Sequence, residues 1–123
     1  MKKILIVEDD KFLRELVVTS LTKKNYIVLE ALDGEEGIKK TKEEKPDLVL
    51  LDLVLPGMDG FEVLTQIKSD PAVSSIPVII FSNLGQKEDV EKGLALGASG
   101  YLVKAHFVLS EVVAKIKQLL DEQ

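Results

Sequence analysis

The chain has 123 residues and a net charge of −5, from 16 Lys and Arg against 21 Asp and Glu. This length predicts one domain over residues 1–123. With no cysteine and a single histidine, His106, the sequence excludes disulfide frameworks, thiol catalysis and multi-histidine metal sites. The acidic balance argues against direct nucleic-acid binding, because domains that bind nucleic acid are usually basic.

The N-terminal segment does not have the pattern of a signal or a membrane anchor. No apolar run in the chain approaches the roughly 20 residues that a membrane-spanning helix needs. The first apolar run, residues 4–7, is shorter than a signal-peptide core, and acidic residues 8–10 follow it at once. We therefore expect a cytoplasmic protein without membrane insertion.

Five short apolar runs rich in β-branched residues predict strands at 4–7, 26–29, 48–51, 78–81 and 101–103. Helical periodicity fills the stretches between them. The first helix is predicted to bury Leu13, Leu16, Val17 and Leu21. The corresponding stripes in the third and last helices are Phe61, Leu64 and Ile67, and Val112, Ile116 and Leu119. The second and fourth helices, near Asp33 and Gln86, are weaker because each contains a glycine.

Short polar side chains mark the predicted helix starts. Asp33 and Asp59 are each followed three residues later by a glutamate, an arrangement typical of helix N-termini. We assign Asp10 to the N-cap of the first helix and Ser110 to the N-cap of the last.

The order strand–helix, repeated five times, predicts a parallel sheet with crossover helices. Because the strand segments are continuously apolar, we expect helices on both faces of the sheet. The second strand has polar flanks and is placed at an edge. Right-handed crossovers then allow the strand order 2-1-3-4-5 of a doubly wound α/β fold.

The residues that end the strands are the candidate site, since ligands bind at the carboxyl ends of parallel strands. They are Glu8, Asp9 and Asp10 after the first strand, then Asp52, Ser82 and Lys104. Carboxylates gathered in one crevice repel one another unless a cation neutralises them, and Mg²⁺ prefers such oxygen ligands. A carboxylate beside that ion can attack phosphorus, with lysine and serine stabilising the phosphoryl oxygens.

Simpler interpretations exist for each residue alone. The acidic run could be a solvated helix N-terminus. Lys104 could make only a structural ion pair with Asp52. Tyr101 could be a partly buried core aromatic, and His106 is best interpreted as a surface or packing histidine.

Four segments in this order resemble a known family: ILIVEDD at 4–10, DLVLLDLVLPGMDG at 47–60, PVIIFS at 77–82 and GASGYLVK at 97–104. Over essentially the whole chain, the sequence resembles the receiver domain of two-component response regulators. The resemblance implies a flavodoxin-like fold with a single five-stranded sheet.

The resemblance also implies residue roles. Asp52 would accept a phosphoryl group from a histidine kinase or phosphotransfer protein. Glu8 and Asp9 would hold Mg²⁺ together with Asp52 and the backbone carbonyl of Val54. After transfer, Ser82 would hydrogen-bond the phosphoryl group and Lys104 would pair with one of its oxygens. Tyr101 would swing inward when Ser82 moves, which makes Ser82 and Tyr101 the switch pair.

Two departures from the family pattern have consequences. Ala105 follows Lys104 where the family usually has proline, so we expect a trans peptide there. The positions two residues beyond Asp52 and Ser82, which tune dephosphorylation in the family, are the apolar Val54 and Leu84. Since neither can orient water, we expect a comparatively long-lived aspartyl phosphate.

We therefore predict a phosphorylation-dependent signalling switch rather than an enzyme with a separate substrate. Because the chain ends after the fifth helix, we expect it to bind a downstream protein, as a monomer or weak dimer. The alternative is that the chain is a receiver excised from a larger protein. A magnesium-dependent phosphatase is disfavoured, since Val54 stands where such enzymes carry a second acid. A flavin-binding module is disfavoured because the acidic run would repel a phosphate, and a degenerate docking receiver because the acidic set is intact.

Overall fold

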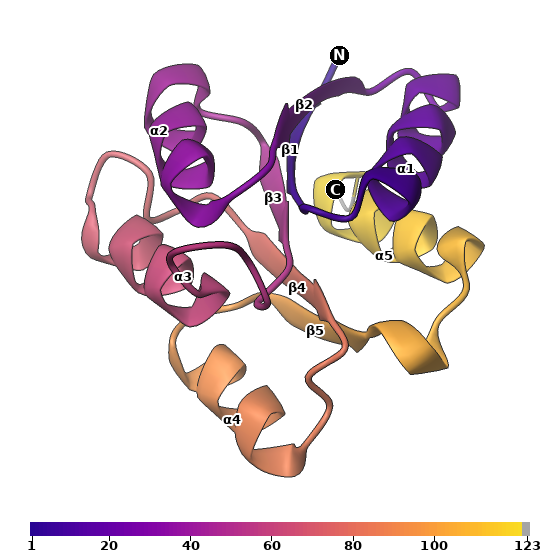
Figure 1. The fold of residues 1–123 in the computed structure, drawn as a ribbon. Helices are drawn as coiled ribbons and strands as arrows, with labels where there is room; N and C mark the ends of the chain where they lie inside the picture. The colour runs from indigo at the N-terminus through magenta and orange to yellow at the C-terminus, as the bar shows by residue number, and fades with distance from the viewer. Residues whose placement is uncertain (122–123) are drawn as a thin grey trace.

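In the computed structural model, which describes residues 1–121, five β-strands alternate with five α-helices (Figure 1). The strands are β1 Lys3–Val7, β2 Ile27–Ala31, β3 Leu48–Leu51, β4 Val78–Ser82 and β5 Gly100–Val103. The helices are α1 Lys11–Lys23, α2 Gly34–Glu44, α3 Gly60–Ser69, α4 Lys87–Ala95 and α5 Leu109–Asp121, with a 3-10 helix at Lys104–His106.

All strand pairs are parallel, and the sheet order is β2-β1-β3-β4-β5. The predicted fold class and the edge position of the second strand are both confirmed. β3 lies at the centre of the sheet, and all four of its residues are buried. Burial of a side chain such as leucine stabilises the fold by about 1.5–3 kcal/mol.

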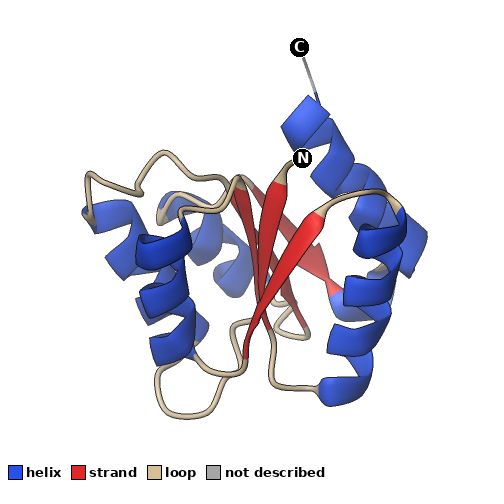
Figure 2. Ribbon diagram, turned by 90° about the horizontal axis from the view of Figure 1, so that it is seen from above, coloured by secondary structure: helices blue, strands red, loops and turns tan. Residues whose placement is uncertain are grey.

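Helices cover both faces of the sheet, as Figure 2 shows from above. Ile4 and Ile6 of β1 belong to the core under α1 and α5. Leu5 and Val7, which alternate with them, belong to the core under α2 and α3. This alternation explains why the strands are apolar without interruption.

Three predicted helix starts are confirmed by hydrogen bonds. The carboxylates of Asp10, Asp33 and Asp59 accept from the backbone N–H three residues on, at 3.1, 2.8 and 3.1 Å. The prediction that Ser110 caps α5 is wrong, because α5 begins at Leu109 and Ser110 lies in its first turn. There the Glu111 carboxylate accepts from the N–H of Val108 at 3.0 Å and satisfies the backbone donor.

Two sequence predictions needed small corrections. Leu16 was expected in the buried stripe of α1, but it is 53% exposed, because Val17 and Leu21 already fill the contact with the core. The second strand begins at Ile27 rather than Tyr26 and extends to the buried Ala31. Neither change alters the topology.

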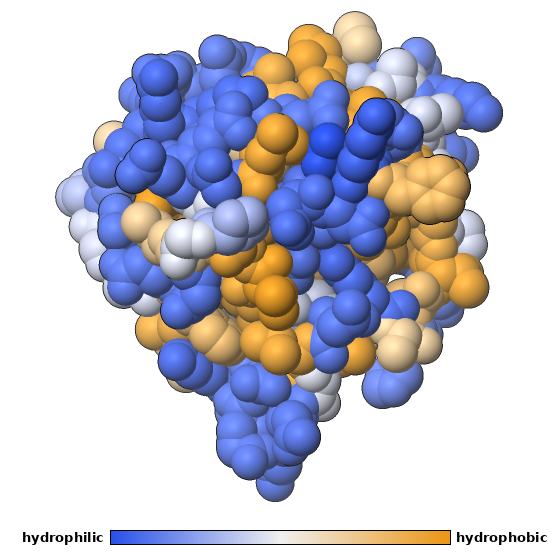
Figure 3. Space-filling model, viewed as in Figure 1, coloured by the Kyte–Doolittle hydropathy of each residue, from blue (hydrophilic) through white to orange (hydrophobic). Residues whose placement is uncertain are grey.

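The surface of the protein carries both hydrophilic and apolar side chains. On the face shown in Figure 3, apolar areas interrupt a mostly hydrophilic surface, and the lobe that α4 forms at the foot of the view is hydrophilic. Within residues 1–121, no helix has both the length and the apolar character that crossing a membrane would require.

Candidate functional site

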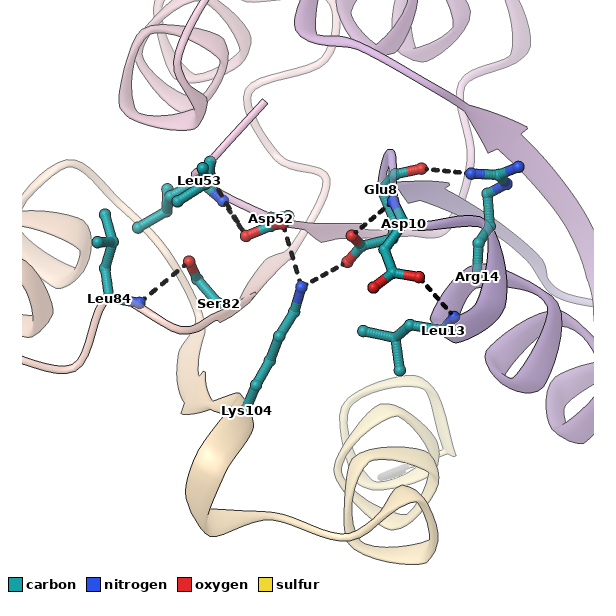
Figure 4. A network of polar contacts seen from close by, with 10 residues as sticks. Glu8, Asp10, Leu13, Arg14, Asp52, Leu53, Ser82, Leu84 and Lys104 are labelled. Atoms are coloured by element: carbon teal, nitrogen blue, oxygen red, sulfur yellow. Dashed lines mark hydrogen bonds and ion pairs between the residues drawn. The ribbon is translucent and has the colours of Figure 1, made fainter. Parts of the chain in front are cut away.

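The predicted site residues meet at one edge of the sheet. Val7 is paired with Leu51, so Glu8 and Asp52, the next residue of each segment, emerge side by side. Ser82 ends β4 opposite Val103, and Lys104 follows directly. The structure thus brings together residues that are up to 96 positions apart in the sequence, counted from 8 to 104 (Figure 4).

Asp52 is buried and held on both carboxylate oxygens. Its side chain is 5% exposed, and its backbone N–H donates to the Val7 carbonyl at 3.0 Å. Oδ1 accepts from the N–H groups of Leu53 at 2.7 Å and Val54 at 3.3 Å. Oδ2 accepts from Lys104 Nζ at 3.1 Å. The carboxylate therefore has a fixed orientation toward the crevice.

Lys104 bridges two acids. Its ammonium lies 2.9 Å from Glu8 Oε1 and 3.1 Å from Asp52 Oδ2. Burial disfavours the charge on Lys104, but the contacts with Glu8 and Asp52 outweigh burial and raise the pKa of Lys104 above its usual value. The lysine thus remains a cation between the two carboxylates.

Glu8 is the second buried acid, at 4% exposure. Burial raises the pKa of Glu8; the hydrogen bond from Lys104 opposes that rise, and the charge of Asp52 adds to it. The net direction is upward. An ionised Glu8 is therefore costly here unless positive charge is close by.

The acids form a cluster that fits a metal ion. Glu8, Asp9 and Asp52 each offer a carboxylate oxygen, and these oxygens lie within 4.8 Å of one another. Asp9 is exposed, whereas the other two are buried. Oxygen donors in such a set suit a hard divalent cation that keeps some of its water, as Mg²⁺ does.

Ser82 and Tyr101 contact the loop after β4 rather than Asp52. Ser82 is fully buried, and its Oγ accepts from the N–H of Leu84 at 3.3 Å. The Tyr101 hydroxyl donates to the carbonyl of Leu84. In the described part of the chain, no hydrogen bond joins Ser82 to Asp52, because the serine hydroxyl is engaged by the loop after β4.

Tyr101 is half-buried, as expected of a partly buried core aromatic, and its role as a switch stays a prediction. Burial raises the pKa of its hydroxyl to about 12, and the charges of Asp89 and Asp52 contribute. Gly93 of α4 allows the close approach of the ring, since a Cβ there would lie 3.0 Å from the Tyr101 ring.

The expected trans peptide after Lys104 is confirmed, because residues 1–121 contain no cis bond. Lys104 begins the 3-10 helix, in which His106 is exposed, as predicted. The only His, Cys, Asp and Glu cluster found among the described residues is the acidic one, and His106 is not in it.

Sequence reasoning missed Arg14. Its guanidinium donates to the backbone carbonyl of Glu8 at 2.9 Å and to Glu30 Oε1 at 3.0 Å. The sequence did carry a signal for it. A cation in the first turn of a helix interacts unfavourably with the helix dipole, which suggests that its side chain has a partner outside the helix. Glu30, in the edge strand β2, is thereby linked to Glu8 through this arginine.

The chain matches the response regulator receiver domain family over residues 4–117. It is 38% identical over 120 residues to the "DNA-binding dual master transcriptional regulator RpaA" of Synechocystis, covering 98% of this chain and 49% of that protein. The chain thus spans about half the length of this curated relative.

Solved structures of response regulators are similar to this chain as well. The Mn(2+)-bound form of response regulator Rcp1 has a TM-score of 0.85 at 32% identity, covering 96% of this chain and 93% of that chain. The phosphorylated cyanobacterial phytochrome response regulator RcpA has a TM-score of 0.84 at 33% identity, covering 97% and 93%. The fold, the strand-end residues and these similarities agree, and the chain belongs to the response regulator receiver domain family.

Proposed function

We propose that this chain is a phosphorylation-dependent switch in which Asp52 accepts a phosphoryl group from a histidine kinase or phosphotransfer protein. One observation carries the proposal: a buried carboxylate at a strand end is oriented by two backbone N–H groups and a lysine. A structural ion pair alone would not need the acidic cluster around it. The phosphorylated relative RcpA supports the same chemistry here.

In the proposed step, a carboxylate oxygen of Asp52 attacks the phosphorus of a phosphohistidine. The new O–P bond forms as the N–P bond breaks, and the electron pair leaves with the imidazole nitrogen, which can take up a proton. Lys104 is positioned to pair with a phosphoryl oxygen, since its ammonium already contacts Oδ2. Ser82 would supply a hydroxyl hydrogen bond after releasing Leu84.

Mg²⁺ would be held by Glu8, Asp9, Asp52 and, as the family pattern implies, the backbone carbonyl of Val54. When bound, it supplies positive charge that offsets the repulsion between the acids and the incoming phosphoryl oxygens. The solved Mn(2+)-bound form of the relative Rcp1 supports the binding of a divalent ion.

We further propose that the chain is not an enzyme with a separate substrate, and that it catalyses only its own phosphorylation and dephosphorylation. Val54 stands where an aspartate-based phosphatase would need a second acid for proton transfer. Turnover of a small phosphate monoester that is lost in Asp52→Asn would contradict this.

The output is proposed to be altered binding of a protein partner, without direct nucleic-acid contact. RpaA is named as DNA-binding, but the chain matches only half of it, and this chain carries a net charge of −5. Large exposed apolar side chains, with Phe12 at 80%, Val108 at 63% and Val54 at 57%, give a protein partner surface to contact.

The test is incubation with acetyl phosphate and Mg²⁺, followed by intact mass. We expect one added phosphoryl group, which is absent in Asp52→Asn and absent when a chelator removes the metal. Asp59→Asn is the matched control, because asparagine also caps helices well and Asp59 caps α3 without belonging to the acidic cluster. Modification that persists in Asp52→Asn would exclude this acceptor.

A further inference from the structure

Arg14 links the acidic site to the edge of the sheet. Nη1 donates to the Glu8 carbonyl at 2.9 Å, and Nε donates to Glu30 Oε1 at 3.0 Å (Figure 4 shows the contact with Glu8). The arginine side chain is only 12% exposed, whereas Glu30 is 45% exposed. A surface residue of β2 therefore anchors a nearly buried guanidinium.

The place of this arginine needs an explanation. Arg14 lies in the first turn of α1, and that turn contains no acidic residue. The free N–H groups of a helix N-terminus favour anions, so a cation there weakens the helix. The contacts of the side chain with Glu8 and Glu30 offset that cost, which indicates a role outside the helix.

Arg14 donates its hydrogen bond to the peptide group that connects two of the acids. The Glu8 carbonyl belongs to the peptide group that joins Glu8 to Asp9, so its orientation sets how the two acids are placed relative to each other. The other polar groups of Glu8 are also engaged: its N–H donates to the Ala31 carbonyl at 3.0 Å, and its carboxylate contacts the Asp10 N–H and Lys104.

We propose that Arg14 is a positioning residue for the divalent-cation site. By holding the peptide between Glu8 and Asp9, it fixes the relative position of their carboxylates before the ion binds. The inference rests on the proposed function, because it takes these acids to be cation ligands. Residues that orient metal ligands from behind typically change metal affinity by about 10–100-fold when they are replaced.

Arginine rather than lysine is required by this geometry. Its planar fork donates in two fixed directions at once, to a carbonyl on one side and a carboxylate on the other. Glu30 completes the arrangement, and its own backbone carbonyl accepts from Lys40, which holds the end of β2. Lysine at position 14 could satisfy one acceptor but not hold both in the same plane.

The experiment is a calorimetric titration of the unphosphorylated protein with Mg²⁺. We expect Arg14→Gln to bind about 10-fold more weakly than the parent, with smaller losses in Arg14→Lys and Glu30→Gln. Lys42→Gln is the matched control: it breaks an exposed ion pair with Asp70, 3.7 Å long and outside the acidic cluster, and should leave the affinity unchanged.

A second readout separates positioning from a general loss of structure. In Arg14→Gln, phosphorylation by acetyl phosphate should need about 10-fold more Mg²⁺ for half its maximal rate but reach the parent's rate at saturating Mg²⁺. This follows because Asp52 and Lys104 are unchanged. A purely structural effect would lower the unfolding temperature without moving the Mg²⁺ dependence.

Parent-like Mg²⁺ affinity in Arg14→Gln would overturn the inference. If Arg14→Gln does not fold, Glu30→Gln decides, because it removes only the anchoring charge, and parent-like affinity there would overturn the inference equally. A parent protein that binds no Mg²⁺ would instead refute the proposed function, so the two failures are distinguishable.

Discussion

The hydroxyl of Tyr101 donates a hydrogen bond to the backbone carbonyl of Leu84, whose own N–H donates to Ser82 Oγ at 3.3 Å. The phenol, the loop after β4 and the buried serine are therefore linked in series. A phosphoryl group on Asp52 that recruits the Ser82 hydroxyl would withdraw it from Leu84. We propose that this releases Tyr101 from the loop, which is the inward movement that the family resemblance implies.

Alkaline titration tests the surroundings of Tyr101. The folded protein raises the pKa of this hydroxyl from 10.0 to about 12, mainly by burial, so the folded state holds the proton more tightly than the unfolded chain. The resulting stability is fully present below pH 10 and is lost as the pH rises toward about 12. Urea unfolding of the parent and Tyr101→Phe at several pH values should show this extra loss in the parent alone. Parallel loss in both proteins would contradict it.

Removing the lysine between the two acids should destabilise the protein. Lys104→Gln leaves Glu8 and Asp52 close together without their cation, and we expect the free energy of unfolding to fall by about 2 kcal/mol. Mg²⁺ binds only the folded site, so it should restore part of the loss. Urea unfolding with Mg²⁺ or with a chelator measures both effects.

The control for Lys104→Gln is Lys3→Gln, which breaks the more exposed ion pair with Glu44, 3.5 Å long. Its cost should be below about 1 kcal/mol and should not depend on Mg²⁺. Equal losses in the two variants would show that the buried position of Lys104 has no special effect.

The lifetime of the phosphorylated state should be set by two apolar side chains. Val54 is 57% exposed and Leu84 is half-buried, and neither can hydrogen-bond an attacking water. We expect Val54→Asn or Leu84→Glu to speed loss of the phosphoryl group, by up to about 100-fold if water becomes well oriented. Intact mass over time after removal of acetyl phosphate gives the rates. Leu94→Glu, on α4, is the control and should leave the rate of phosphoryl loss unchanged.

Gly60 should be intolerant of any side chain. A Cβ there would lie 2.4 Å from the Asp52 carbonyl oxygen and 2.5 Å from Leu53 Cα, both of which are backbone atoms. We expect Gly60→Ala to cost about 1–3 kcal/mol in the free energy of unfolding. It should also slow phosphorylation, since relief of the clash shifts the acceptor segment. Thr65→Ala, an exposed position in the same helix, should do neither.

The sequence was sufficient to predict the fold and most of the site because both follow from one geometric rule. Parallel strands end at the same edge, so Glu8, Asp52 and Lys104 could be placed together without coordinates. The partners of Arg14 could not be placed in this way, because they depend on how α1 lies against the sheet, although the cation in the first turn was a signal. Ser110 was misassigned because α5 begins before it, at Leu109, where Glu111 accepts from the Val108 N–H, and residue preference alone did not show this. The Val54 carbonyl as a metal ligand and the Tyr101 movement stay predictions.

The direct continuation of β3 into Asp52 has a mechanical consequence. Asp52 follows the central strand, whose residues are all buried, with no spacer, and its N–H donates to the Val7 carbonyl of the adjacent strand. Close-packed interiors resist displacement, so the sheet cannot yield to an added phosphoryl group. The adjustment must therefore occur in the loops at the carboxyl edge of the sheet. A change at Asp52 thus reaches the surface through movement of these loops, while the sheet stays fixed.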